Sequence, residues 1–382
     1  MRITVLLGAF FPVPPLRGGA VEKIWFALGQ ELARRGHTVT QVSRRCDGLP
    51  AEEPLAGVRH LRIQGYDTPA SLLRLKWLDL LYTRRALRVL PAADIILTNT
   101  FWAPLFVRPA RHGLLYVHVA RFPKGQLRWY RRATRLQTVS TPLLEAMRAA
   151  APRLAARFEV VPNPVEVPAT VPAPEEREPV VLYAGRIHPE KGLALLVDAW
   201  ARLAPGHPGW RLRLAGPWDT ARGGGGEEFK RGLEARAARA GTSVEFTGGL
   251  FAPGALEAEL RRAAVFVYPS IAERGETFGV APLEAMAHGC PAVVSNLACF
   301  TDFIAHGRNG LVFDHRDADA AGRCAETLGP LLADPARRAA LAAAARETAR
   351  DFSVATVAGR YEESFRRALT DALPAPLPPP AP

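Results

Sequence analysis

Cysteine is scarce in this sequence. The 382 residues contain four, Cys46, Cys290, Cys299 and Cys324, which form no CxxC pair and have no histidine at metal-ligand spacing. We therefore predict no metal site, and we interpret the four thiols as small buried or partly buried side chains in a reducing compartment.

Long apolar runs are also missing. No run reaches the 18 or so residues that a transmembrane helix needs. The first residues, MRITVLLGAFFPVPP, contain one basic residue and no small-residue cleavage site. They indicate a buried strand and a proline-bounded loop rather than a signal peptide. We therefore expect a cytoplasmic protein.

Acidic residues are few in the first half of the chain. Residues 1–160 hold 25 Lys and Arg against 10 Asp and Glu, whereas residues 161–382 hold 24 against 27. The excess positive charge of the first half favours an anionic partner, such as a membrane or an anionic acceptor, or a solvated Arg-rich surface. No nucleic-acid motif is visible, so we expect no nucleic-acid partner.

The basic segment Arg121–Arg135 concentrates this charge. It holds six cations with Trp129 and Tyr130 between them. Cations with interleaved aromatics are typical of a surface that contacts an anionic bilayer or a lipid-phosphate acceptor, at the inner face of a membrane for a cytoplasmic protein. A solvated Arg-rich helix is an equally good interpretation.

Strands and helices alternate twice along the chain, which predicts an α/β fold of two domains, each with a doubly wound, mostly parallel sheet. In the first series we expect strands at 3–7, 38–43, 94–98, 113–119 and 137–140, and helices at 20–35, 69–89 and 142–150. In the second we expect strands at 180–184, 210–215, 243–247, 265–268 and 291–295, and helices at 192–202, 227–240, 254–262, 283–288 and 300–306. Two further helices are expected at 334–350 and 354–373.

Six prolines within residues 162–179 mark the predicted linker between the domains. The predicted organisation is a first domain over 1–161, the linker over 162–179 and a second domain over 180–350. A helix over 351–373 would pack back towards the first domain, and a disordered proline-rich tail would occupy 374–382. Four consecutive glycines, Gly223–Gly226, have no following Lys-Ser/Thr, so we interpret them as a flexible connection rather than a phosphate loop.

The segment VVLYAGRIHPEKG, Val180–Gly192, places two cations after a buried strand. Arg186 follows the strand, and Lys191 with Gly192 opens the next helix. Two cations at the carboxyl end of a strand, beside a helix N-terminus, form a clamp suited to a diphosphate. An isolated Arg and Lys in a loop are usually only solvated.

The segment from Pro269 to Gly289, PSIAERGETFGVAPLEAMAHG, places Glu276 and Glu284 eight positions apart. We expect Glu276 on a loop and Glu284 at the start of a short helix, where a carboxylate lies at the positive end of the helix dipole. Both can accept hydrogen bonds from hydroxyl groups. Between them, the backbone N–H groups of Thr277, Phe278, Gly279 and Val280 can approach an anion, which suggests a nucleotide-sugar pocket.

Two features of the first domain are further candidates. Gly18 and Gly19 directly precede the predicted helix at 20–35, where a side-chain-free backbone and a helix start favour an anionic ligand. His118 ends the predicted strand 113–119. A histidine in that position is more often structural than catalytic.

The combination of these motifs resembles glycosyltransferase family 4, the retaining glycosyltransferases of GT-B fold. The resemblance rests on GR and KG within 185–192, on the Glu276–Glu284 segment, on Gly18-Gly19 with the helix sequence ELARRGHTVT, and on Asn309-Gly310-Leu311-Val312. Three departures are the long loop Ile271–Gly275, Pro164 where the family usually has Gly, and Glu166 where it usually has Asp.

The resemblance implies two Rossmann-like domains facing across a cleft. It implies that Arg186 and Lys191 neutralise a leaving diphosphate, that Glu276 contacts the transferred sugar and Glu284 the ribose, and that His118 faces the reacting sugar. It implies a transferase that moves a sugar from a UDP- or GDP-sugar to a glycan, a lipid-linked or a small-molecule acceptor, without a cofactor or metal. A sugar-nucleotide epimerase of the same fold and a non-catalytic sugar-nucleotide-binding module remain alternatives, whereas a glycosidase would leave Arg186 and Lys191 without a purpose.

Overall fold

The computed structural model describes residues 1–16 and 18–372, which form two compact units. Of the described residues, the first unit comprises those up to Asn163 together with 354–372, and the second comprises Pro164–Ser353. The boundary between Asn163 and Pro164 lies near the start of the proline-rich segment, so most of that segment belongs to the second unit. The predicted tail at 374–382 lies outside the described residues.

The first unit is built on an eight-stranded sheet in the order β3-β4-β2-β1-β5-β6-β7-β8. All neighbouring strands pair in parallel except β3 with β4. The strands are β1 (Arg2–Leu6), β2 (Thr38–Arg44), β3 (Glu52–Leu55), β4 (Val58–Ile63), β5 (Ile95–Thr98), β6 (Leu114–Val119), β7 (Arg135–Thr138) and β8 (Phe158–Val160).

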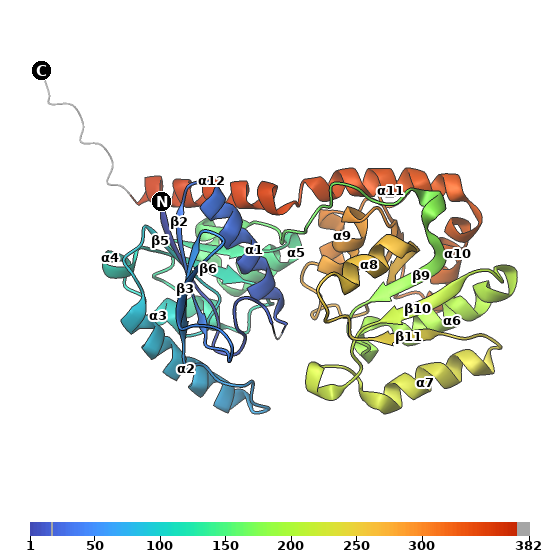
Figure 1. Ribbon diagram of the computed structural model, residues 1–382, viewed down its shortest axis with the longest axis horizontal. Coiled ribbons are helices and arrows are strands. Elements are labelled where there is room, and N and C mark those ends of the chain that lie inside the picture. The colour runs from blue at the N-terminus through green and yellow to red at the C-terminus, as the bar shows by residue number, and fades with distance from the viewer. Residues whose placement is uncertain (17, 373–382) are drawn as a thin grey trace, which may run out of the picture. The chain divides into compact units, whose positions relative to one another are not determined.

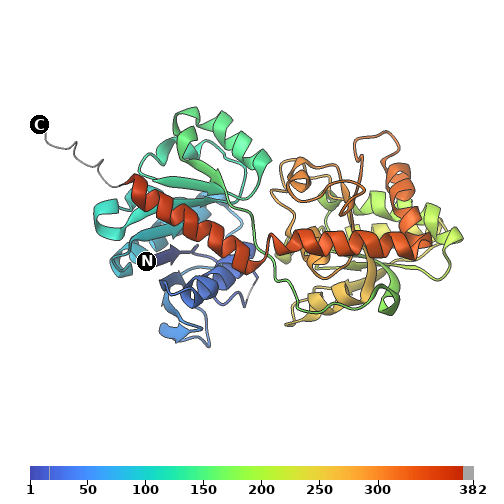
Figure 2. The ribbon, with the colours of Figure 1, turned by 90° about the horizontal axis from the view of Figure 1, so that it is seen from above.

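Helices cover both faces of this sheet, as expected for parallel strands. They are α1 (Ala20–Arg34), α2 (Leu72–Val89), α3 (Ala103–Phe106), α4 (Pro109–His112), α5 (Thr141–Ala150) and α12 (Val354–Asp371). Helix α12 comes from the far end of the described chain, yet it packs beside α1 (Figure 2). Its Tyr361 and Phe365 join Trp25 of α1 in one buried cluster.

The second unit holds a six-stranded sheet in the order β11-β10-β9-β12-β13-β14, with every pairing parallel. Figure 1 labels β9, β10 and β11 of this sheet. The strands are β9 (Glu178–Ala184), β10 (Arg211–Ala215), β11 (Glu245–Gly248), β12 (Ala263–Tyr268), β13 (Ala292–Ser295) and β14 (Leu311–Phe313). The helices are α6 (Leu193–Leu203), α7 (Gly226–Arg239), α8 (Ala255–Arg262), α9 (Val280–Ala287), α10 (Ala320–Ala333) and α11 (Pro335–Arg350).

The helix predicted at 300–306 is wrong, because the chain there makes only a 3₁₀ turn over Ala298–Asp302. Asn309 prevents a longer helix: its side chain accepts a hydrogen bond from the Ala305 N–H at 2.8 Å and donates one to the Phe303 carbonyl at 2.9 Å. These bonds satisfy the backbone locally and turn the chain towards β14, a strand that the pattern did not predict.

The proline-rich segment is hydrogen-bonded to the second unit. Arg346 donates to the carbonyls of Pro168 and Ala169, both at 2.8 Å, and Arg261 donates to the Thr170 carbonyl at 2.8 Å. Proline removes backbone donors but keeps every carbonyl, so arginine side chains are suitable partners for such a segment.

The strand order of each sheet reverses at one point. In the first unit this occurs between β1 and β5, and in the second between β9 and β12. Loops at the carboxyl ends of strands that flank such a reversal diverge and leave a crevice, which is where open α/β sheets bind ligands. In the second unit, the loops after β9 and β12 carry the two motifs predicted to bind a nucleotide-sugar.

Candidate functional site

Arg186 leaves the carboxyl end of β9 and is held on three sides. The Tyr183 hydroxyl donates to its backbone carbonyl at 2.8 Å, while the guanidinium donates to the Gly223 carbonyl at 2.8 Å and pairs with Glu190 at 2.6 Å. Its side chain is still 44% exposed. The guanidinium is therefore oriented by neighbours but remains accessible to an anion.

The glycine run Gly223–Gly226 is packed, and its interpretation as a flexible connection is wrong. The Gly225 N–H donates to the Ile187 carbonyl at 2.8 Å, and the Gly226 N–H donates to the Trp218 carbonyl at 2.7 Å. These bonds attach the run to the loop after β9 and to the loop after β10. The run thus holds the Gly223 carbonyl where it accepts the hydrogen bond from Arg186.

Lys191 lies in a 3₁₀ turn, Pro189–Lys191, that ends at Gly192 in the left-handed conformation, with φ 67°. A Cβ on Gly192 would lie 2.0 Å from the Pro269 carbonyl oxygen, so only glycine allows this turn to approach the end of β12 so closely. The approach brings Lys191 and Glu276 together: the Lys191 Nζ lies 2.7 Å from Glu276 Oε2.

This ion pair is largely buried, with 8% of the Lys191 side chain and 13% of the Glu276 side chain exposed. The Tyr268 hydroxyl donates to the same Glu276 oxygen at 3.0 Å, and the Lys191 Nζ lies 5.4 Å from the centre of the Tyr268 ring. A buried ion pair is a poor source of stability, because desolvation offsets most of the attraction. Its position at the switch point places it in the candidate site.

Tyr268 and Tyr183 form a stacked pair, with ring centres 5.6 Å apart, that supports both halves of the site. Burial raises the pKa of each phenol well above its usual range, so both stay protonated and donate. Neither tyrosine was predicted to belong to the site. Only their position in the sequence could have indicated them: each lies within the last two residues of a strand that flanks the reversal.

Helix α9 begins at Val280, directly after Gly279, whose φ is 88°. A Cβ on Gly279 would lie 2.4 Å from the Phe300 ring, so glycine is required both by conformation and by space. Thr277 and Phe278 lead into this helix start, with Phe278 buried. The predicted backbone anion site therefore coincides with a true helix N-terminus.

The prediction that Glu284 opens a helix is wrong, because Glu284 is the fifth residue of α9. The helix starts earlier than the pattern indicates since Pro282 falls in its first turn, where proline is tolerated. Glu284 thus lies one turn beyond the N-terminus and does not sit at the positive end of the dipole.

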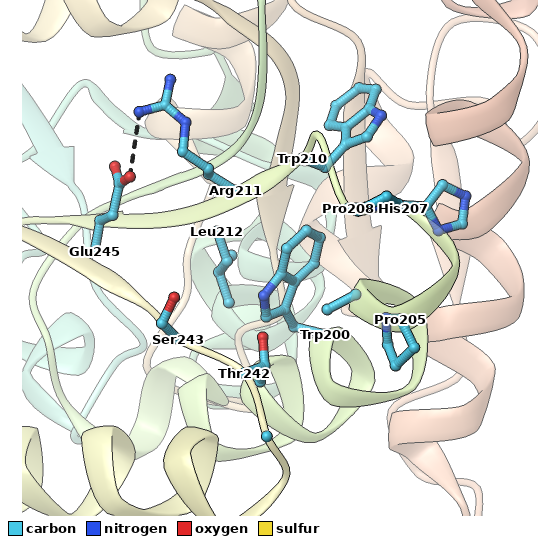
Figure 3. A pocket seen from close by; sticks show the side chains of 12 residues that line it. Trp200, Pro205, His207, Pro208, Trp210, Arg211, Leu212, Thr242, Ser243 and Glu245 are labelled. Atoms are coloured by element: carbon cyan, nitrogen blue, oxygen red, sulfur yellow. Dashed lines mark hydrogen bonds and ion pairs between the residues drawn. The ribbon is translucent and has the colours of Figure 1, made fainter.

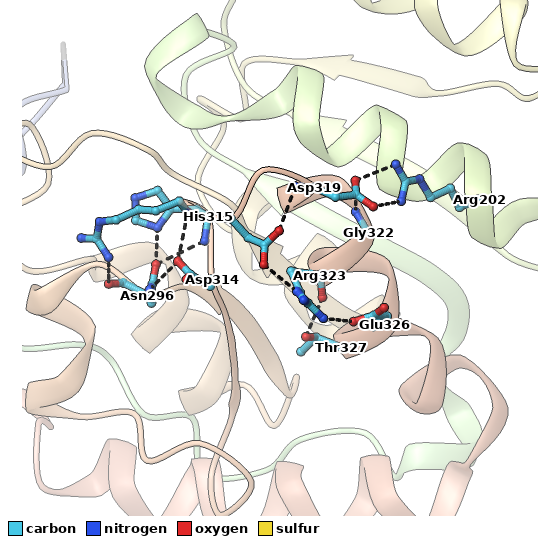
Figure 4. A network of polar contacts seen from close by, with 11 residues as sticks. Arg202, Asn296, Asp314, His315, Asp319, Gly322, Arg323, Glu326 and Thr327 are labelled. Carbon is cyan, nitrogen blue, oxygen red and sulfur yellow. Dashed lines mark hydrogen bonds and ion pairs between the residues drawn. The ribbon is translucent and has the colours of Figure 1, made fainter.

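The long loop Ile271–Gly275 is anchored by a polar network at the ends of β13 and β14. Glu273 accepts from His315 Nε2 at 3.1 Å and pairs with Arg316 at 2.6 Å. The Asn296 side chain accepts from the His315 N–H at 3.2 Å and donates to Asp314 at 2.8 Å (Figure 4). The network thus attaches the loop that precedes Glu276 to the ends of two strands of the sheet.

In the first unit, Gly18 and Gly19 have φ values of 83° and 99°, and Gly19 immediately precedes α1. A Cβ on Gly19 would lie 2.3 Å from Glu22 Oε2, so the Glu22 carboxyl is next to the glycine loop. Glu22 is only 5% exposed, and burial raises its pKa to about 7, against its own backbone N–H and the charge of Arg121.

His118 is buried near the end of β6 and has a defined hydrogen-bond partner. Its Nδ1 lies 2.6 Å from Gln137 Oε1, and the Gln137 amide nitrogen donates to the carbonyls of Thr138 and Val161. Burial lowers the pKa of His118 to about 4, so the ring is neutral at pH 7. Because Gln137 presents an acceptor, Nδ1 carries the proton and Nε2 has an unshared pair, with no partner among the described residues.

The structure thus brings Lys191 and Glu276 into contact, and Tyr183 and Tyr268 connect that pair with the Arg186 loop. Gly279 and Val280 form the helix start that follows Glu276 along the same segment. Gly18, Gly19 and His118 belong to the other unit and lie at the carboxyl edge of its sheet. Among the described residues, there is no group of three or more His, Cys, Asp or Glu side chains that could hold a metal ion.

A pocket of about 650 Å³ occurs at the opposite edge of the second sheet (Figure 3). It includes Arg211 and Glu245, the first residues of β10 and β11. Arg211 is already paired with Glu178 at 2.9 Å and with Glu245 at 3.2 Å, and Trp200 at its wall is 2% exposed. Its charges are satisfied within the protein, so the carboxyl edge is the better candidate site.

Two Rossmann-like α/β units, one with clustered cations and carboxylates at its switch point, define the class of the GT-B glycosyltransferases. The chain matches the family described as Glycosyltransferase Family 4 over residues 18–167 and the family described as Glycosyl transferases group 1 over residues 170–348. Together these matches cover most of the chain, which therefore belongs to the group 1 glycosyltransferase family.

Similar curated proteins include alpha-maltose-1-phosphate synthase of Mycolicibacterium smegmatis, 32% identical over 228 residues, which cover 55% of this chain and 57% of the relative. D-inositol 3-phosphate glycosyltransferase of a Nocardioides species is 34% identical over 199 residues, or 50% of this chain and 42% of the relative. The chain spans only about half the length of these relatives.

Solved structures share the whole fold. Sucrose-phosphate synthase from Thermosynechococcus elongatus superposes with a TM-score of 0.76 at 22% identity, covering 97% of this chain and 100% of that chain. HepE from Anabaena in complex with UDP and glucose gives 0.71 at 20% identity, covering 96% and 99%.

Proposed function

We propose that the protein is a retaining, metal-independent glycosyltransferase that moves a sugar from a UDP- or GDP-sugar to a carbohydrate, lipid-linked or small-molecule acceptor. The buried pair of Lys191 and Glu276 at the switch point carries the proposal. Family membership supports the transfer reaction. The similar HepE structure contains UDP and glucose, which supports a nucleotide-sugar donor.

The two members of the pair suit different parts of such a donor. The Lys191 ammonium has three donors, and Glu276 occupies one, which leaves the others for diphosphate oxygens. The Glu276 carboxylate accepts hydrogen bonds and fits the hydroxyls of the transferred sugar. The ion pair thus places the sugar and the diphosphate next to one another.

The remaining residues complete the donor site. Arg186 binds the diphosphate with its exposed guanidinium, and the backbone N–H groups of Phe278–Val280 bind phosphate oxygens at the start of α9. Glu284, one turn along α9, accepts from the ribose hydroxyls. In the first unit, Gly18, Gly19 and His118 stay predicted donor contacts: the Gly18 N–H already donates to the Pro15 carbonyl at 3.2 Å, so the Gly19 N–H and His118 Nε2 are the groups that would contact the donor.

In the reaction, the bond between the anomeric carbon and the diphosphate breaks while the acceptor oxygen bonds to the same face of that carbon. The acceptor proton goes to the departing phosphate oxygen. Negative charge grows on the diphosphate as an oxocarbenium-like sugar forms, so fixed positive charge from Arg186, Lys191 and the helix start lowers the barrier. These cations occupy the role of a divalent metal.

Glu276→Gln tests the assignment, because it keeps the size of the side chain and an acceptor for Tyr268 but removes the charge. We expect transfer to fall on the order of a hundredfold, as for loss of one preorganised electrostatic group, with the affinity for the nucleotide diphosphate nearly unchanged. Transfer is measured as nucleotide release in chelator, and affinity by calorimetry. Glu228→Gln, on the exposed face of α7, is the matched control.

Full transfer activity in Glu276→Gln would remove Glu276 from the site. The donor is identified first by thermal shift against UDP, GDP, ADP and dTDP and their common sugars, with chelator present. Nucleotide-sugar consumption without an acceptor would favour the epimerase. Stabilisation by a nucleotide-sugar that is never consumed would favour a binding module.

A further inference from the structure

A large apolar surface of the first unit is exposed to solvent at the beginning of α2. The side chains of Leu72, Leu73 and Trp77 are 73%, 82% and 58% exposed. Side chains of this size are normally buried, and several together mark an interaction site. Leu73 and Trp77 are four residues apart and therefore lie on the same face of the helix.

Aromatic residues of two neighbouring segments extend this surface. Phe106 ends α3 and is 39% exposed, and Trp129 ends a 3₁₀ turn over Gln126–Trp129 and is 49% exposed. The segments are joined through Phe101, whose ring centre lies 6.1 Å from Trp129 and 4.7 Å from the Lys76 Nζ of α2. We call the exposed residues Leu72, Leu73, Trp77, Phe106 and Trp129 the aromatic face.

The aromatic face is surrounded by positive charge with almost no negative charge. Residues 72–89, 101–112 and 121–135 together contain thirteen Lys and Arg and a single acidic residue, Asp79. Asp79 is buried and accepts from the Phe101 N–H at 3.3 Å, so its charge is not presented on the surface. Arg74, Lys76, Arg128, Arg131 and Arg132 are all exposed.

In the basic segment 121–135, the aromatic residues that face outward differ in part from those predicted. Tyr130, expected at an interface, is 4% exposed and donates its hydroxyl to the Phe101 carbonyl at 2.9 Å. Trp129 is the outward aromatic, with the Arg128 guanidinium 5.4 Å from its ring centre. The segment forms a short turn instead of a helix, and most of the exposed apolar area comes from α2.

We propose that the aromatic face docks the protein on an anionic lipid bilayer. Leucine and tryptophan side chains would enter the boundary between headgroups and acyl chains, while the arginine and lysine side chains around them contact lipid phosphates. A bilayer fits this surface better than a protein partner does, because one kind of charge surrounds the apolar residues on several segments and anionic lipid supplies the opposite charge everywhere.

The location of the aromatic face agrees with a peripheral mode of binding. Helix α2 follows β4, α3 follows β5 and the 3₁₀ turn follows β6, so all three leave the carboxyl edge of the first sheet. Gly18, Gly19 and His118 lie at the same edge. In residues 1–16 and 18–372, no helix is long and apolar enough to span a bilayer. The proposal does not depend on the transfer reaction.

The test uses the full chain and vesicles in a flotation assay. Vesicles of equal parts phosphatidylcholine and phosphatidylglycerol are compared with pure phosphatidylcholine. We expect binding to the anionic vesicles at low salt, at least tenfold weaker binding to the neutral ones, and weakening by added salt. Leu73→Ser with Trp77→Ser should lower binding to the anionic vesicles at least tenfold. Both side chains are exposed, so the fold should be retained.

Phe251→Ser is the matched control, because Phe251 is 62% exposed but belongs to the second unit. It should bind vesicles as the unchanged protein does. Brominated lipids give an independent reading: they should quench tryptophan fluorescence, and Trp77→Phe should reduce the quenching. Absence of flotation at low salt would overturn the proposal. So would self-association in lipid-free buffer that Leu73→Ser with Trp77→Ser abolishes, which would assign the aromatic face to a second copy.

Discussion

His118 presents a lone pair, because Gln137 fixes which ring nitrogen carries the proton. The Gln137 amide nitrogen is committed to two carbonyls, so its oxygen can only accept from His118 Nδ1. A neutral ring with the proton on Nδ1 accepts hydrogen bonds at Nε2, whereas the other tautomer would donate there. Gln137 is therefore a positioning residue for His118.

Gln137→Leu removes this control. We expect transfer to fall about tenfold or more, since His118 can then adopt either tautomer, while the affinity for the nucleotide diphosphate stays the same. The measurement is a double-mutant cycle with His118→Ala. If Gln137 acts through His118, Gln137→Leu has no further effect on transfer in the His118→Ala background. An equal loss in both backgrounds would indicate a purely structural role.

The Glu22 carboxyl gives the first unit a pH-dependent stability. Its pKa of about 7 exceeds the ordinary value of 4.5, so between these values the folded protein holds a proton that the unfolded chain has lost. The free energy of unfolding therefore falls as pH rises: the contribution is fully present below pH 4.5 and is lost through pH 7. The shift corresponds to at most about 3 kcal/mol.

Glu22→Gln keeps the side-chain shape and cannot ionise. The free energy of unfolding is measured in urea. At pH 5 we expect the variant and the unchanged protein to have similar values. At pH 8 the variant should be the more stable of the two, by up to about 3 kcal/mol. Parallel pH dependences of the two proteins between pH 5 and 8 would contradict the pKa assigned to Glu22.

At the level of elements, the alternating pattern located most strands within about two residues, because buried parallel strands are short, continuous apolar runs. The hairpin of β3 and β4 was not predicted, because Glu52–Leu55 contains two glutamates and a proline, a composition typical of a loop. Helix α10 was missed because Gly322, Gly329 and Pro330 lower its helical propensity, which packing against α6 overrides.

The site was predictable only as far as its local motifs. Arg186, Lys191 and Glu276 are predicted as site residues because their segments follow recognisable strands. The contact between Lys191 and Glu276 spans 85 positions and depends on the approach of Gly192 to Pro269, which no local pattern encodes. Tyr183 and Tyr268 were missed for the same reason, since aromatic residues in a strand usually belong to the core.

At the scale of the whole molecule, the first unit depends on α12. Trp25 packs on Tyr361 with ring centres 4.9 Å apart, and Glu159 accepts a hydrogen bond from Ser364. A chain of residues 1–163 would expose this apolar face and leave the buried Tyr116 hydroxyl without one of its partners, Ser364.

We expect the fragment 1–163 to be insoluble or to lack a cooperative unfolding transition. Joining residues 354–372 to its end through a flexible glycine-serine linker should restore both. Solubility and the near-ultraviolet circular dichroism of the aromatic cluster provide the measurements. A fragment 1–163 that unfolds cooperatively on its own would show that α12 is dispensable for this unit.

The place of α12 in the chain also sets an order of events during translation. The first unit begins to leave the ribosome before the second. Its core is incomplete until α12 has been synthesised. Pro164–Ser353 is continuous and has all of its strands available earlier. Domains generally fold as units once their chain has emerged. The half that is synthesised first would thus be the last to reach its native state.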